Sequence, residues 1–216
     1  MGLFDFFTKK KEKKKVEEIE FDYKRPEDIN QEIVEIDIPD IEFVVDNRDK
    51  NVPTILLMDD FKGMTTLLCD ELKRVECCDI YSNYNVAVAT GDYAAFIVEK
   101  ALSEGLKVDV AFLDITLGGV VNNVEYDGVD VAIMIKDKYP DSLVKFVTGH
   151  TLNRKNPEIF QFIKKFEEHF NTNIEDTYEV QTNQGTENIY KHIIQKNSDR
   201  VLLMERAILE YNEKSN

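Results

Sequence analysis

Three aspartates directly follow apolar segments of the sequence. Asp59 and Asp60 end the run 55–58, and Asp114 ends the run 110–113. Short apolar runs between helix-like segments predict buried parallel strands, and ligands bind at the carboxyl ends of such strands in open α/β sheets. Carboxylates about 4 Å apart repel each other by roughly 4 kcal/mol at an effective dielectric of about 20, so the cluster must share protons or hold a cation. A pocket of acidic oxygens suits Mg²⁺, which bridges to phosphoryl oxygens.

The pattern from Pro53 onward predicts the framework that positions these acids. Strands are expected over 54–58, 86–89, 108–113 and 143–147, and helices near 62–75, 92–104 and 129–138. The apolar spacing of 157–170 is helical, which leaves Thr177 to Thr182 as the expected fifth strand. Alternating strands and helices predict an α/β fold with a doubly wound, five-stranded parallel sheet.

Composition and charge limit the classes of function. The 216 residues carry a net charge of −15, which disfavours binding to nucleic acid through its phosphates. No apolar run approaches the roughly 18 residues that cross a bilayer. Cys69, Cys77 and Cys78 form no C-x-x-C pair, and without a signal peptide they favour a cytoplasmic location. We expect Cys69, which lies in a helical pattern, to be a small core residue.

The chain is expected to have three parts. Residues 1–52 form an N-terminal extension with a basic tip and an acidic linker, partly disordered. In the tip, residues 1–15, six lysines follow a short apolar stretch, which suits either a solvated tail or weak contact with an anionic membrane. The linker can add one or two edge strands to the sheet. Residues 53–196 are expected to be the main domain, and 197–216 a C-terminal helical extension.

A second pattern concerns the C-terminal part of the chain. Apolar residues recur there at alternating intervals of three and four, which is the spacing of a coiled-coil seam with one polar position. A long final helix with this seam would pair with a second copy of the chain, which makes a homodimer one candidate assembly. The alternative is a helix that packs on the sheet, followed by a short helix that begins near Asn197, Ser198 and Asp199. The seam residues are Tyr190, Ile194, Asn197, Val201, Met204, Ile208 and Tyr211.

Further motifs complete a pattern around the three acids. Asp127-Gly128 opens a helix that ends in Lys138-Tyr139-Pro140-Asp141, and Thr148-Gly149-His150 follows the fourth strand. With Asp59-Asp60 and Asp114, these motifs resemble, in order and placement, the receiver domain of bacterial two-component response regulators. The likeness covers residues 53–150 closely and 151–196 loosely. It implies a flavodoxin-like receiver that stands alone, without an identifiable output domain.

The resemblance also implies roles for individual residues. Asp114 would accept a phosphoryl group from a histidine kinase or a phosphotransfer protein. Asp59, Asp60, Asp114 and the backbone carbonyl of Thr116 would hold Mg²⁺, and the Thr148 hydroxyl would contact the phosphoryl group. The signal would then pass to a downstream protein through protein contacts. This describes a phosphoacceptor signalling protein rather than a turnover enzyme.

One residue of the family pattern is not found in the expected place. Receivers have a lysine at the end of strand five, but the expected strand over 177–182 holds no lysine. Lys164 and Lys165 lie in a segment with helical spacing, so we expect the lysine to be lost. The loop from Gly118 to Tyr126 is long and lies where it can cover the site.

Two other functions remain open at this point. The missing lysine favours a pseudo-receiver, an interaction module that keeps the sheet but is not phosphorylated. A haloacid-dehalogenase-like phosphatase is a further alternative, because Asp114-Ile115-Thr116 and Thr148 suit its motifs. In that class, however, the acid pair follows the threonine, whereas here Asp59 and Asp60 come first. Acids at single strand ends also simply cap helices, but three acids at consistent strand ends favour a shared site.

Overall fold

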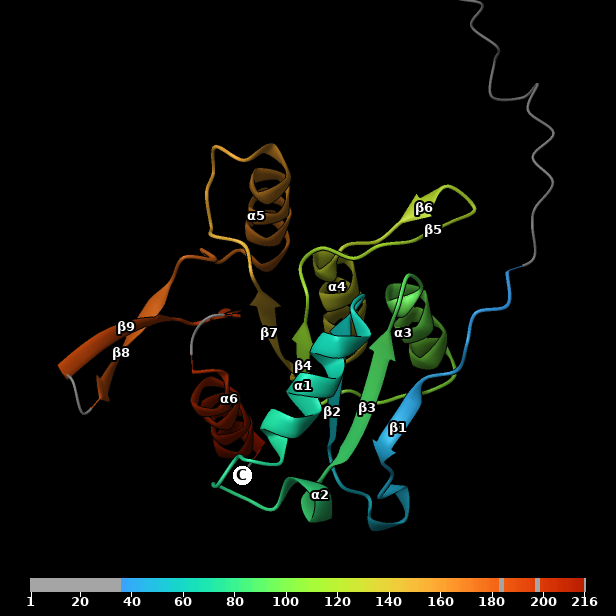
Figure 1. Ribbon diagram of the computed structural model, residues 1–216, viewed down its shortest axis with the longest axis horizontal. Coiled ribbons are helices and arrows are strands. Elements are labelled where there is room, and N and C mark those ends of the chain that lie inside the picture. The colour runs from blue at the N-terminus through green and yellow to red at the C-terminus, as the bar shows by residue number, and fades with distance from the viewer. Residues whose placement is uncertain (1–35, 183–184, 197–198, 216) are drawn as a thin grey trace, which may run out of the picture. The chain divides into compact units, whose positions relative to one another are not determined.

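The computed structural model describes residues 36–182, 185–196 and 199–215. Figure 1 shows their helices and strands, which alternate along most of the chain. The strands are β1 (Glu42–Val45), β2 (Thr54–Asp59), β3 (Asn85–Thr90), β4 (Val110–Leu113), β5 (Val120–Val121), β6 (Val124–Glu125), β7 (Leu143–Thr148), β8 (Thr177–Thr182), β9 (Gly185–Tyr190) and β10 (Ile193–Gln195). The helices are η2 (Arg48–Lys50), α1 (Lys62–Leu72), α2 (Ile80–Asn83), α3 (Ala94–Ser103), α4 (Gly128–Lys138), α5 (Pro157–Phe170) and α6 (Arg200–Ser215).

A six-stranded sheet forms the centre of the fold, in the order β1-β3-β2-β4-β7-β10. Five of these strands are parallel, and they follow the 2-1-3-4-5 order of flavodoxin-like folds. The sixth, β1, pairs antiparallel with β3 at the edge. The predicted doubly wound parallel sheet is therefore confirmed, as is an edge strand from the acidic linker. Residues 1–35, which include the basic tip, lie outside the described residues.

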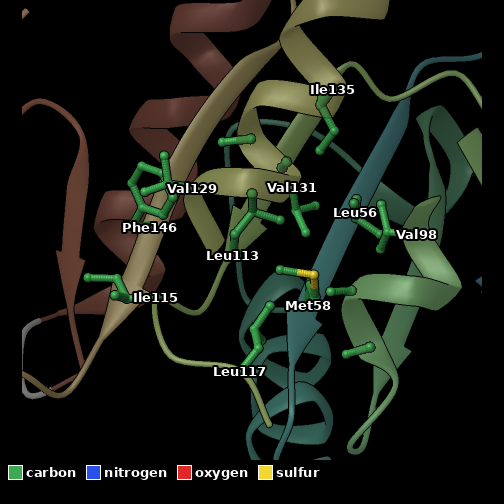
Figure 2. Close-up of a cluster of buried hydrophobic side chains, with 14 of the residues drawn as sticks. Leu56, Met58, Val98, Leu113, Ile115, Leu117, Val129, Val131, Ile135 and Phe146 are labelled. Carbon is green, nitrogen blue, oxygen red and sulfur yellow. The ribbon is translucent and has the colours of Figure 1, made fainter. Parts of the chain in front are cut away.

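Helices cover both faces of this sheet, because the apolar strands are buried on both sides. Ile55 and Leu57 of β2 face a cluster that includes residues of α1 and α6, whereas Leu56 and Met58 face residues of α3, α4 and α5. Figure 2 shows the second cluster, with Leu56 and Met58 beside side chains of α3 and α4. Cys69 of α1 is a buried member of the first cluster, as expected from its helical spacing. Among the described residues, no helix is both long and apolar enough to span a membrane.

The predicted fifth strand is wrong. Residues Thr177–Thr182 form β8, which pairs antiparallel with β9 in a separate two-stranded sheet. The fifth parallel strand is β10, in which Ile193 pairs with Phe146 of β7. The β8 segment alternates like a strand, but a hairpin satisfies that pattern as well as a central sheet does. β10 spans only Ile193–Gln195, too short to give a periodic signal in the sequence.

The predicted coiled-coil seam is also wrong. Tyr190 and Ile194 belong to strands β9 and β10, and the final helix α6 begins only at Arg200. Met204 and Ile208 have no exposed surface, because they pack against the sheet in the same cluster as Ile55 and Leu57. The spacing of apolar residues along α6 therefore reflects burial within the chain. The long C-terminal helix itself is present, as predicted.

Candidate functional site

Asp59, Asp60 and Asp114 meet at the carboxyl ends of β2 and β4. These strands are parallel neighbours whose register pairs Met58 with Leu113, so the acids that follow reach the same level. One carboxylate oxygen from each aspartate lies within 4.8 Å of the others. Asp59 and Asp114 are buried, and Asp60 is partly exposed. The structure therefore brings together the three acids that the sequence predicted to converge.

Backbone amides hold each of these carboxylates in place. One oxygen of Asp59 accepts a hydrogen bond from the Phe61 amide at 2.9 Å, and one of Asp114 accepts from the Ile115 amide at 2.9 Å. Asp60 accepts from the Gly118 amide at 3.1 Å. Because each bond uses a single oxygen, further lone pairs of every carboxylate remain for other partners.

Lys196 supplies a positive charge to the cluster. It follows β10 directly, and its ammonium donates to Oδ2 of Asp59 at 2.9 Å and to Oδ2 of Asp114 at 3.1 Å. The expectation that the strand-five lysine is lost is therefore wrong, since the error in the fifth strand hid it. The signal that could have found it is Ile193-Ile194, a very short apolar pair followed closely by Lys196.

The pKa values reflect this mixture of burial and charge. Burial raises the pKa of Asp114 to about 6, the charge of Asp59 raises it too, and the nearby Lys196 ammonium opposes this rise. Burial also lowers the pKa of Lys196, but the hydrogen bonds and charges of Asp59 and Asp114 outweigh it and raise that pKa above its usual value. Lys196 is therefore fully charged at neutral pH. Its single positive charge leaves two negative charges when the three aspartates are ionised, which a divalent cation would balance.

An ion pair between a buried glutamate and a mostly covered arginine holds the segment that carries Lys196. The guanidinium of Arg200 in α6 binds the carboxylate of Glu71 in α1 through both oxygens, with a shortest distance of 2.6 Å. The same guanidinium also donates to the backbone carbonyl of Lys196. Arg–carboxylate pairs with this two-pronged geometry fix direction as well as distance. Arg200 therefore links the position of the Lys196 backbone to α1. The sequence analysis did not identify Glu71 and Arg200 as an ion pair.

The two threonines that the resemblance singled out lie near the same end of the sheet. Thr148 ends β7 and is completely buried, and its hydroxyl accepts the amide of His150 at 3.0 Å. Its carbonyl accepts the Lys196 amide at 2.7 Å, which makes Thr148 a direct neighbour of the lysine. Thr116 is exposed and lies two residues after Asp114.

The long loop after β4 forms a small hairpin beside the acids. Strands β5 and β6 pair antiparallel, and Val120 and Val124 on this hairpin are exposed. Gly119, at its base, has a positive φ of 90°, and a Cβ there would lie 1.7 Å from the carbonyl oxygen of Asp92. Only glycine fits this position, so the base of the hairpin is held between Asp60 and the turn that precedes α3.

Together these groups form the set that phosphoryl transfer needs. A buried carboxylate can attack phosphorus, neighbouring carboxylates can hold a divalent cation, and an ammonium can stabilise charge on the phosphoryl oxygens.

Comparison with solved structures found similar folds. The chain is similar to RcsB from Salmonella enterica serovar Typhimurium bound to promoter rprA in the presence of phosphomimetic BeF3−, at 16% identity and a TM-score of 0.46, over 74% of this chain and 98% of that chain. It is similar to the BeF3-activated DrrB receiver domain, at 16% identity and a TM-score of 0.42, over 75% of this chain and 98% of that chain. A further RcsB response regulator structure from Salmonella typhimurium has 16% identity and a TM-score of 0.44, over 74% of this chain and 60% of that chain.

The chain thus spans about three fifths of the length of that last structure. These similar structures are response regulators or their receiver domains. No family model matches the sequence, and no curated protein matches it.

Proposed function

We propose that this protein is a receiver-like signalling protein that accepts a phosphoryl group on Asp114. The observation that carries the proposal is the convergence of three aspartates within 4.8 Å, with Lys196 bonded to two of them. Acids that only cap helices do not require an ammonium group shared between two of them. The lysine also removes the main argument for a pseudo-receiver, which was its expected loss.

The proposed metal is Mg²⁺, held by Asp59, Asp60, Asp114 and the backbone carbonyl of Thr116. The donor set fits, because hard divalent cations prefer carboxylate and carbonyl oxygens. The raised pKa of Asp114 supports this assignment, since it reflects burial and the nearby charge of Asp59 that a cation would relieve. When bound, Mg²⁺ would neutralise charge on the phosphoryl oxygens and orient them.

In the proposed reaction, a carboxylate oxygen of Asp114 forms a bond to phosphorus. The bond from phosphorus to the donor breaks, which is a P–N bond in a phosphohistidine of a kinase or phosphotransfer protein and a P–O bond in acetyl phosphate. The leaving group keeps the electron pair, and the product is an acyl phosphate on Asp114. Lys196 would exchange its bond to Asp114 for one to a phosphoryl oxygen, and the Thr148 hydroxyl would supply a second contact.

The proposed output is contact with a downstream protein. An acyl phosphate carries about −1.5 to −2 charges, in place of the single negative charge of an ionised Asp114, beside Lys196 and Thr148 at the ends of β10 and β7. Movement of these groups would alter the neighbouring surface of α5 and α6. The net charge of −15 supports an output through protein rather than through nucleic acid.

The proposal can be tested by intact-mass measurement after incubation with acetyl phosphate and Mg²⁺. We expect one added phosphoryl group that is removed by hydroxylamine and does not form in EDTA. Asp114→Asn should abolish the addition, and the matched Asp137→Asn, at an exposed position of α4, should not. No mass shift with acetyl phosphate or with a panel of histidine kinases would instead favour the pseudo-receiver. Continuous release of phosphate without an accumulated adduct would favour the phosphatase.

A further inference from the structure

A large cavity lies at the opposite end of the sheet from the three aspartates. Its volume is about 980 Å³, and its lining includes Asp109 and Leu143, at the amino ends of β4 and β7. The last turns of α4, α5 and α6 and residues next to β10 complete the wall. Small-molecule sites are commonly concave, largely apolar cavities of this size with a few convergent polar groups. The proposed function makes no use of this cavity.

The cavity is positively charged, although the chain is strongly acidic. Six lysines and only three acidic residues line it, whereas the whole sequence has a net charge of −15. An excess of cations in one concave region of an acidic protein attracts small anions and repels cations. The six lysines are Lys107, Lys136, Lys138, Lys145, Lys191 and Lys214.

Two of these ammonium groups are held in place and still have a donor to spare. Lys136 donates to the carbonyl of Pro140 and, at 2.8 Å, to that of Ser142. Lys145 donates to the carbonyl of Lys191 at 2.6 Å and to Glu210 at 2.8 Å. An ammonium has three N–H donors, so each has one left within the described part of the chain. No carboxylate of the described residues forms an ion pair with Lys136.

Hydrogen bonds bring two of the lysines together. Lys145 and Lys214 donate to different oxygens of the Glu210 carboxylate, each at 2.8 Å, so one negative charge is shared by two ammonium groups. Burial and the charge of Lys214 lower the pKa of Lys136, and the charge of Asp141 opposes them. A bound anion would add negative charge where the ammonium groups outnumber the carboxylates.

Aromatic side chains form the apolar part of the wall. The hydroxyl of Tyr211 is fixed by a hydrogen bond to Asp109 at 2.8 Å, and the ring of Tyr178 lies 4.8 Å from the guanidinium of Arg206. Tyr139 and Phe170 also line the cavity. Aromatic rings provide flat surfaces on which a ligand ring can stack.

We propose that this cavity binds a small anionic molecule with an aromatic body, which is the chemistry of a nucleotide. The phosphates would take the spare donors of Lys136 and Lys145 and lie near Lys214. The base would contact the aromatic wall formed by Tyr139, Phe170, Tyr178 and Tyr211. The site would be independent of Asp114, since it lies at the other end of the strands.

Calorimetric titration of the full chain with ATP in EDTA tests this proposal. EDTA removes divalent ions, so ATP cannot bind at the aspartates through a bridging metal. We expect ATP to bind in the micromolar to millimolar range, and adenosine and inorganic phosphate to bind at least about tenfold more weakly. No heat of binding with millimolar ATP would overturn the proposal, and so would equal affinities for ATP and adenosine.

The variant Lys136→Gln tests whether ATP binds in this cavity. A glutamine amide has two N–H donors and can keep both backbone bonds, so the variant removes the charge while preserving the local fold. We expect its Kd for ATP to rise by about tenfold or more, because a charge-assisted hydrogen bond is lost. Lys73→Gln, which removes an exposed lysine of similar charge from the end of α1, should bind like the wild type. If Lys136→Gln does not fold, Lys214→Gln at a more exposed position should show the same weakening. Unchanged affinity in a folded cavity variant would contradict the proposal.

Discussion

The two ends of the parallel sheet differ in charge and in how their charges are held. At the carboxyl ends, three aspartates share one ammonium, that of Lys196. At the amino ends, lysines predominate. Lys136 donates to backbone carbonyls, and Lys145 donates to a backbone carbonyl and to the carboxylate of Glu210. Acidic groups thus gather where helices begin, and basic groups gather where helices end.

Helix dipoles explain part of this difference. Helices that follow parallel strands have their N-termini at the carboxyl ends of the strands, where the partial positive charge favours acids. Their C-termini lie at the other end, where free carbonyls accept hydrogen bonds from lysines. The fold therefore separates the two charges before any ligand binds. What distinguishes the aspartates is the convergence of their carboxylates, and what distinguishes the lysines is the cavity that they line.

The largest expected effect comes from breaking the ion pair that holds the acidic end together. Glu71→Gln leaves the Arg200 guanidinium, whose side chain is only 15% exposed, without its counter-charge, which should cost about 4 kcal/mol of unfolding free energy. The variant should also be phosphorylated more slowly at saturating donor, because the Lys196 backbone loses its link to α1. Denaturant unfolding and the rate of mass increase measure the two effects.

Its matched control is Glu76→Gln, an exposed position after α1. Both quantities should stay at wild-type values in that variant. If Glu71→Gln loses stability but phosphorylates at the wild-type rate, the ion pair supports the fold without positioning Lys196.

The next largest effect is a dependence of stability on pH without metal. The pKa of Asp114 is about 6 in the folded chain against an ordinary value of 3.8, so the folded state binds an extra proton between these values. Stability should therefore fall as pH rises through this window, by at most about 3 kcal/mol. Urea unfolding in EDTA at several pH values measures the slope.

In Asp114→Asn, this contribution to the slope should disappear, and the variant should be more stable than the wild type at neutral pH. Asp137→Asn, at an exposed position, should retain it. An unchanged dependence of stability on pH in Asp114→Asn would show that burial and neighbouring charges do not raise the pKa of Asp114.

A smaller effect is expected at the basic end. Glu210→Gln removes the partner of the buried Lys145 ammonium, but Glu210 itself is 37% exposed, so the cost should be about 2 kcal/mol rather than that of a fully buried pair. Glu213→Gln, an exposed position on the same helix, should cost almost nothing. A loss below 0.5 kcal/mol, within the usual range for surface substitutions, would show that solvent already compensates Lys145.

The smallest effect is the response to metal. Millimolar Mg²⁺ should stabilise the folded chain by about 1 kcal/mol if its concentration is several times the Kd, because only the folded state gathers the three aspartates. Asp60→Ala should reduce this gain, and the gain should be absent when K⁺ replaces Mg²⁺ at equal ionic strength. A melting temperature indifferent to Mg²⁺ in the wild type would contradict the metal site.

The sequence predicted the cluster of aspartates at the carboxyl ends of the strands but not the lysine-lined cavity at their amino ends. Asp59, Asp60 and Asp114 directly follow apolar strands, so strand-end position alone brought them together. The role of Lys196 was not predicted, because β10 is very short and the sequence of β8 resembles that of a strand in the central sheet. In the structure β8 pairs with β9 in a separate hairpin. In the same way, apolar spacing along α6 suggested a seam between copies, whereas Met204 and Ile208 pack within the chain.

The lysines of the cavity come from several separate segments, and no local pattern connects them. Their convergence depends on where α4 and α6 end relative to the strands, which only the tertiary structure defines. The ion pair between Glu71 and Arg200 is equally non-local. Sites built from strand ends can be predicted from sequence, whereas sites built from helix ends and long-range pairs cannot.

The central claim is that the acidic end transfers a phosphoryl group to one particular carboxylate. Borohydride reduces an acyl phosphate to an alcohol and so converts the modified aspartate to homoserine, which peptide mass spectrometry can locate. After treatment with acetyl phosphate and Mg²⁺, we predict homoserine at position 114 and at no other aspartate. Homoserine at Asp59 or Asp60, or a phosphorylated protein that yields none, would contradict the account.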